Sequence, residues 1–174
     1  MAVMEKKEID RSLQRVAAGD AAAFELLYDK MKRGVFAFAY TYLGNYADAE
    51  DAVQETFLTV KRKAELYRAG TDGRAWIFQI AKNYCLDELR KRKLRFEKGE
   101  EHFAEPYAEP HLPLLSEMVK ELDDDEKEIV VLHAVWDYKH REIAEMLEIP
   151  LGTVTWKYKR AIEKLKAKEL SENT

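Results

Sequence analysis

Apolar residues recur every three or four positions along the chain, and this spacing constrains the fold more than any other feature. One buried face is formed by Phe24, Leu27, Tyr28, Met31, Val35, Phe38, Ala39 and Tyr42. This is the period of an amphipathic helix. Only seven Gly and four Pro occur in 174 residues, and no stretch alternates as a strand does. The sequence therefore predicts an all-α protein.

The same spacing predicts two more helices in the N-terminal half. The pair Gly44-Asn45 ends the first helix, and a second follows with Ala49, Ala52, Val53, Phe57 and Val60 inward. Two glycines within residues 68–73 predict a loop. A third helix is expected from Arg74 to about Arg95. Its buried residues are expected to be Ile77, Ile80, Ala81, Tyr84 and Leu89.

A stretch without periodicity divides the chain. Pro106, Pro110 and Pro113 lie there among Glu, His and Tyr. We therefore expect a flexible linker over residues 97–113, between two small helical domains over residues 1–96 and 114–174. The second domain is expected to begin with a helix over residues 114–122. Three more helices should follow, the first of them capped by Asp123 or Asp124.

Composition narrows the class of protein. The single Cys85 cannot form an internal disulfide, and no apolar run approaches the roughly 18 residues that span a bilayer. The first ten residues lack the apolar core of a signal peptide. These features predict a cytoplasmic protein, in which Cys85 is a small buried apolar residue without a reactive role.

Charge is unevenly distributed. The net charge of −4 alone argues against nucleic-acid binding, but basic residues gather at positions 90–98 and 157–168. Acidic residues gather at positions 48–55 and 117–128. This distribution predicts local contact with phosphates and a separate partner that accepts an acidic surface.

Two short predicted helices meet at residues 148–152. Pro150 cannot continue the first of them but suits the first turn of the second. The outward face of that last helix carries polar, basic and aromatic side chains: Thr153, Thr155, Trp156, Lys157, Lys159 and Arg160. Such a helix can enter the major groove of DNA. A helical hairpin with a merely solvated basic face explains the periodicity equally well.

The N-terminal half has two polar faces of its own. Helical spacing leaves Asp48, Asp51, Gln54, Glu55 and Leu58 exposed, which suits docking onto a basic partner helix, although a solvated amphipathic helix has the same pattern. A second stripe consists of Trp76, Gln79, Asn83 and Arg90. An aromatic ring, two amides and a guanidinium suit an unstacked single strand. The alternative for Trp76 is an anchor in the core.

These motifs resemble bacterial RNA polymerase sigma factors of the extracytoplasmic-function group. Residues 48–57 (DAEDAVQETF) resemble the core-polymerase-binding segment of sigma region two, and residues 75–83 (AWIFQIAKN) resemble its promoter-melting stretch. Residues 142–154 resemble the helix-turn-helix signature of sigma region four. Lys139 stands where that family usually has a capping Ser, and Asp137 is the alternative cap. Trp156 stands where a small Ser is usual.

The resemblance assigns roles to three sets of residues. Core polymerase would be bound by Asp48, Asp51, Gln54, Glu55 and Leu58. The single strand of the downstream promoter element would be bound by Tyr67, Arg68, Trp76, Gln79, Asn83 and Arg90. The upstream element would be read as duplex by Thr153, Thr155, Trp156, Lys157, Lys159 and Arg160. The implied partners are core RNA polymerase, promoter DNA and an anti-sigma factor, which in this family is often membrane-bound.

Two other classes of protein remain open from the residues alone. A stand-alone helix-turn-helix regulator would bind duplex DNA without polymerase, and the N-terminal motifs would then be coincidental. An enzyme is not favoured, because the sequence has no Gly-rich phosphate loop, no metal-ligand spacing and no plausible catalytic triad. We expect no catalytic residue, metal, cofactor or small-molecule substrate.

Overall fold

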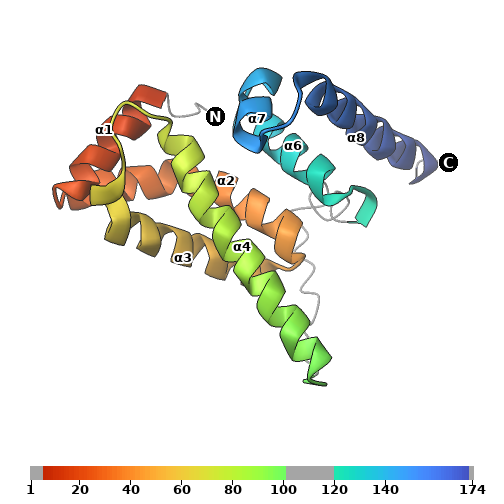
Figure 1. The fold of residues 1–174 in the computed structure, drawn as a ribbon, viewed down its shortest axis with the longest axis horizontal. Coiled ribbons are helices and arrows are strands. Elements are labelled where there is room, and N and C mark those ends of the chain that lie inside the picture. The colour runs from red at the N-terminus through yellow and green to blue at the C-terminus, as the bar shows by residue number, and fades with distance from the viewer. Residues whose placement is uncertain (1–5, 101–119, 173–174) are drawn as a thin grey trace.

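The computed structural model describes residues 6–100 and 120–172, and every regular element in these ranges is helical (Figure 1). The elements are α1 (Lys6–Ala17), α2 (Ala21–Leu43), α3 (Tyr46–Lys63), the short 3-10 helix η1 (Ala64–Leu66), α4 (Gly73–Glu97), α6 (Asp124–Ala134), α7 (His140–Leu147) and α8 (Leu151–Glu172). The predicted all-α class is confirmed. Most of the helix expected over residues 114–122 and most of the expected linker lie outside the described residues; residues 120 and 121 are helical.

Helix α2 is the central element of the N-terminal half, and α1, α3 and α4 pack against it. Its first turn is capped by Asp20, which accepts a hydrogen bond of 3.1 Å from the backbone N–H of Ala23. It ends at Gly44, whose positive φ of 76° is a left-handed conformation that favours glycine. The sequence predicted this end correctly.

Helix α1 was not expected, because the first ten residues were considered only as a candidate leader. Its Ile9, Leu13 and Val16 are buried at spacings of four and three residues, the ordinary pattern of an amphipathic helix. This face packs on the start of α4. A Cβ at Gly73 would lie 2.8 Å from Ile9 Cγ2 and 2.8 Å from Leu13 Cδ1, so the two helices can approach this closely only at a glycine.

Helix α4 begins where Asp72 accepts hydrogen bonds from the backbone N–H groups of Arg74 (3.0 Å) and Ala75 (3.2 Å). Its C-terminal turns extend beyond the other helices of this half (Figure 1). Cys85 is buried as predicted, and burial raises the pKa of its thiol to about 12. A thiol with this pKa stays protonated near neutral pH, in line with the expected lack of reactivity.

In the C-terminal half, the expected cap Asp123 opens α6. It accepts from the backbone N–H of Glu126 at 2.9 Å, and the Glu126 carboxylate accepts from the N–H of Asp123 at 3.1 Å. The suggestion that Asp137 caps α7 is wrong. Asp137 has a φ of 58° in the preceding turn, and the capping residue is Lys139, whose N–H donates to Glu142 at 2.9 Å.

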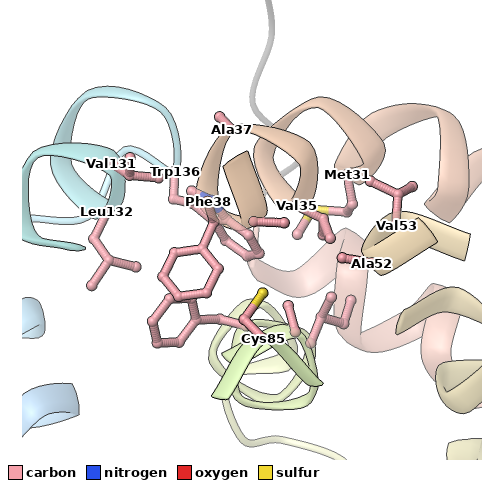
Figure 2. Close-up of a cluster of buried hydrophobic side chains, with 14 of the residues drawn as sticks. Met31, Val35, Ala37, Phe38, Ala52, Val53, Cys85, Val131, Leu132 and Trp136 are labelled. Atoms are coloured by element: carbon pink, nitrogen blue, oxygen red, sulfur yellow. The ribbon is translucent and has the colours of Figure 1, made fainter. Parts of the chain in front are cut away.

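The two halves share one hydrophobic core (Figure 2). Val131, Leu132 and Trp136, from α6 and the turn after it, lie beside Phe38 of α2. The Phe78 ring of α4 meets the Trp136 indole edge-on, with ring centroids 5.8 Å apart. None of the helices in the described ranges has the length and apolarity needed to cross a bilayer.

Candidate functional site

The predicted acidic face lies along α3. The backbone N–H of Asp48 donates to the capping residue Asn45 at 2.9 Å. Asp51, Gln54 and Leu58 are exposed, while Glu55 is half-buried. The opposite side of α3 is buried through Ala49, Ala52, Val53, Phe57 and Val60, as the sequence predicted. All five predicted positions therefore lie on the side of α3 opposite the buried one, with three of them exposed and Asp48 and Glu55 half-buried.

Asp48 differs from the rest of this face. Its carboxylate forms an ion pair with the guanidinium of Arg92, which also donates to the backbone carbonyl of Leu43 at 2.8 Å. Arg92 therefore joins α4 to the α2–α3 junction. Asp48 has a structural contact within the N-terminal half, and any contact with a partner would compete with it.

The predicted stripe on α4 is formed as expected. Gln79, Asn83 and Arg90 are exposed and Trp76 is half-buried. Gln79 donates to the Asn83 carbonyl oxygen at 2.9 Å, so the two amides already pair with each other. Arg90 forms an ion pair of 2.8 Å with Asp87. The Trp76 ring packs on Tyr67 with centroids 5.4 Å apart and ring planes tilted by 54°, so part of the ring is already in contact with the protein itself.

The loop before α4 is held by Asp10, a residue that the sequence analysis missed. One oxygen of Asp10 accepts from the Tyr67 hydroxyl at 2.9 Å and from the backbone N–H of Gly70 at 2.8 Å. These hydrogen bonds lower the pKa of Asp10. Tyr67 is only 8% exposed and shapes the loop, whereas Arg68 is exposed. Of the two predicted loop residues, only Arg68 is therefore exposed enough to contact a DNA strand.

Helix α8 carries the predicted recognition residues. Thr155, Trp156, Lys159 and Arg160 are exposed, and Thr153 and Lys157 are half-buried. The guanidinium of Arg160 lies 5.3 Å from the centre of the Trp156 ring. Two of the three basic residues in this set already face acids of α6: Lys157 lies 2.5 Å from Asp125, and Arg160 lies 3.3 Å from Glu126.

A cluster of three rings fixes α8 to the rest of the C-terminal half. His133 of α6, His140 of α7 and Tyr158 of α8 have mutual centroid distances of 4.7–4.8 Å. Burial, together with the neighbouring His133, lowers the pKa of His140. Within residues 6–100 and 120–172, no three His, Cys, Asp or Glu side chains are grouped so as to hold a metal ion.

Comparison with known proteins identifies both halves. The family described as Sigma-70 region 2 matches residues 27–95, and the one described as Sigma-70, region 4 matches residues 113–165. The ECF RNA polymerase sigma factor SigE of Mycolicibacterium smegmatis is 33% identical over 90% of this chain and 67% of its own. The RNA polymerase sigma factor CarQ of Myxococcus xanthus is 32% identical over 88% and 93%. SigW of Bacillus subtilis, another ECF sigma factor, is 27% identical over 91% and 95%.

Solved structures agree on the fold. CnrH, solved with the cytosolic domain of CnrY, superposes with a TM-score of 0.70 at 24% identity, covering 96% of this chain and 99% of CnrH. RpoE of Bartonella quintana, solved with the anti-sigma factor NepR, gives 0.66 at 23% identity over 79% and 90%. With both halves matched in order by the two sigma-70 regions, the chain belongs to the extracytoplasmic-function (ECF) family of RNA polymerase sigma factors.

Proposed function

We propose that the protein docks on core RNA polymerase through the α3 face and directs the enzyme to promoters. The observation that carries this proposal is the exposure of Asp51, Gln54 and Leu58 on one side of α3, within the segment matched by sigma region two. An acidic helix edged by leucine complements a basic helix of a partner. The protein contributes binding and positioning, with no catalytic step of its own, and acts in the cytoplasm.

The two DNA-reading surfaces divide the promoter between the halves. The exposed groups of α8 read the upstream element as duplex, with Lys159 on phosphates and the Trp156 indole against sugar or a thymine methyl. The stripe on α4 and Arg68 in the loop hold the downstream element as single strand. Because the strand must leave its duplex before these groups can contact it, binding energy rather than chemistry drives the opening of the DNA.

An anti-sigma factor is the proposed regulator. Two proteins of the same fold were solved in complexes, CnrH with the cytosolic domain of CnrY and RpoE with the anti-sigma factor NepR. A partner of this kind would keep the chain from core polymerase until a signal releases it.

The test is capture of core RNA polymerase by the purified chain. The double variant Asp51→Arg, Glu55→Arg reverses two charges on the α3 face, and neither carboxylate has a structural ion pair in the described part of the chain. We expect capture to weaken at least about tenfold, since like charges at an interface cost several kcal/mol and about 1.4 kcal/mol is a factor of ten.

The matched control reverses the same total charge elsewhere. Glu25 of α2 and Glu65 of η1 are also exposed but lie off α3, so Glu25→Arg, Glu65→Arg should capture core as wild type does. Equal losses in both double variants would show a general charge effect and overturn the assignment of the face. No capture by wild type, with specific binding of duplex DNA by the free chain, would favour a stand-alone regulator instead.

A further inference from the structure

The Trp136 side chain packs between the two halves, at a contact site that we call the seat and that is formed by Gly34 of α2 and Phe78 of α4. It lies in the turn between α6 and α7, and only 3% of the residue is exposed. Its indole N–H donates to the backbone carbonyl of Gly34 in α2 at 3.0 Å. A Cβ at Gly34 would lie 3.2 Å from the indole, so the ring sits directly on the helix backbone. On the α4 side, the Phe78 ring meets the indole edge-on.

Polar groups around the indole are paired across the same boundary. Arg74 of α4 is 6% exposed, and its guanidinium donates to the backbone carbonyl of Trp136 at 2.9 Å. The guanidinium also lies 4.3 Å from the centre of the Tyr138 ring. The Tyr138 hydroxyl donates in turn to Asp72, the cap of α4, at 3.2 Å. A buried cation needs such partners, and the C-terminal half supplies a backbone carbonyl and an aromatic ring for this one.

Two further groups of polar contacts lie on either side of the Trp136 contact. Glu128 of α6 accepts from Tyr42 of α2 at 2.8 Å and from Lys82 of α4 at 2.7 Å. On the other flank, Lys6 of α1 lies 3.2 Å from Asp72 and also forms an ion pair with Glu142 of α7. Helices α1, α2 and α4 of the N-terminal half therefore all contribute to holding the C-terminal half, whereas none of these contacts comes from α3.

The exclusion of α3 has a functional meaning. Asp51, Gln54 and Leu58 stay exposed while the halves are packed, so the proposed core-binding face is open. The α8 groups and the α4 stripe, by contrast, are held at one fixed spacing by the contacts of Trp136 and Arg74. Under the proposed function these two surfaces read separate promoter elements, and the packed halves do not let their spacing adjust to the DNA.

We infer that Trp136, seated on Gly34, is an intramolecular latch that keeps the free sigma factor closed. The closed form can dock on core polymerase, and release of the latch precedes simultaneous contact with both promoter elements. The closed state is inferred from the packing of the two halves alone. Its consequence for promoter binding rests on the proposed function.

The first experiment measures the radius of gyration of the free chain by small-angle X-ray scattering. Gly34→Leu fills the seat from the α2 side, and Trp136→Ala removes the indole from the other side. In each variant we expect the radius to rise by roughly a fifth or more above the value of about 16 Å for a compact chain of this length. Circular dichroism of each variant checks that the helices remain.

The controls make the same substitutions outside the seat. Trp156 is 56% exposed, and a Cβ at Gly152 would meet no atom within 4 Å. Trp156→Ala and Gly152→Leu should therefore keep the wild-type radius. A wild-type radius already far above the compact value would overturn the latch. The latch would also be overturned if both Gly34→Leu and Trp136→Ala kept their helices and the wild-type radius.

The second experiment separates the latch from the proposed function. Core capture by Gly34→Leu and Trp136→Ala should equal that of wild type, and the reconstituted holoenzymes should bind promoter DNA faster, in proportion to the gain in open protein. Expanded variants without faster promoter binding would leave the closed state standing but overturn its regulatory role. Loss of core capture by wild type would count against the proposed function and leave the scattering result untouched.

Discussion

Glu126 is a carboxylate at the centre of the C-terminal half, with no exposed surface. One oxygen accepts from the Asp123 N–H and lies 2.6 Å from Lys164, and the other lies 3.3 Å from Arg160. Glu126→Gln keeps the shape but removes the charge that both cations face. We expect the free energy of unfolding to fall by about 1–3 kcal/mol, as for a lost hydrogen bond to a charged group. Urea unfolding measures the change.

Asp125→Asn is the matched control one residue earlier. The Asp125 side chain is 65% exposed and meets only Lys157 at the surface. Exposed ion pairs contribute little, so the loss should stay below about 1 kcal/mol. Equal losses in the two variants would contradict a special role for the buried carboxylate.

The lowered pKa of His140 should make the stability of the protein depend on pH. Burial and His133 lower its pKa in the folded state below the usual 6.5, so the unfolded chain binds the proton more readily. Stability should therefore fall as the pH drops below about 6.5, and stay level above it. The His140→Asn variant should lose less stability between pH 7.5 and 5.5 than wild type does, when both are followed by thermal unfolding. Identical pH profiles would contradict the argument.

At the residue scale, contacts within one helical turn could be predicted from the sequence, whereas contacts between distant residues could not. The cap Asp123 followed from its position before an apolar run, because an N-cap needs only its own next turn. Tyr67 was predicted as a strand-binding residue, yet its hydroxyl is held by Asp10, 57 positions away. No local pattern encodes such a contact. The DNA contacts of the other predicted residues stay predictions.

At the scale of the element, Gly73 decides how closely α1 approaches α4. A methyl group there would lie 2.8 Å from side-chain atoms of Ile9 and Leu13, both of which are fully buried. Gly73→Ala should therefore destabilise the protein by about 1–3 kcal/mol through overpacking, despite the better helix propensity of alanine. Chemical denaturation gives the value.

Gly152→Ala provides the comparison, because Gly152 also lies in a first helical turn but has open space around its Cα. There the propensity of alanine acts alone, so the protein should be as stable as wild type or gain up to about 1 kcal/mol. If Gly73→Ala were as harmless as Gly152→Ala, α1 would have to be mobile on α4.

Most of the helices in the N-terminal half could be predicted from the sequence. Periodicity predicted α2, α3 and α4, since each has a long apolar stripe. In α4 the prediction of burial was only partly right: Ile77 and Ala81 are buried, whereas Ile80, Tyr84 and Leu89 are half-buried. Helix α1 could have been found by the same rule from Ile9, Leu13 and Val16. This apolar stripe is short and lies among charged residues, so the sequence analysis did not predict the helix.

At the scale of the whole molecule, the shared core predicts cooperative unfolding. Removing a buried Trp or its seat costs about 3–5 kcal/mol, which is comparable to the stability of a small domain. Wild type should therefore melt in one calorimetric transition, although the chain has two halves. Gly34→Leu should split this into two transitions or leave a van't Hoff enthalpy below the calorimetric one. Two transitions in wild type would contradict coupling through Trp136.

The packing of the two halves lay beyond the sequence analysis. Gly34 stands in the middle of a strong helical pattern, where it reads only as a tolerated weak point. Its role depends on an indole 102 positions later. Buried Arg74 likewise looks like an ordinary solvated cation until Trp136 and Tyr138 are placed around it. Such contacts depend on tertiary structure, and spacing along one helix carries no sign of them.

The ion pairs between α6 and α8 affect how the chain would respond to salt. DNA binding releases condensed counterions, and the logarithm of affinity falls with the logarithm of salt concentration by about 0.9 per neutralised phosphate. When Lys157 leaves Asp125, or Arg160 leaves Glu126, the freed carboxylate attracts a cation from solution. That uptake offsets part of the release, so a salt titration of upstream-element binding will report fewer phosphates than α8 touches.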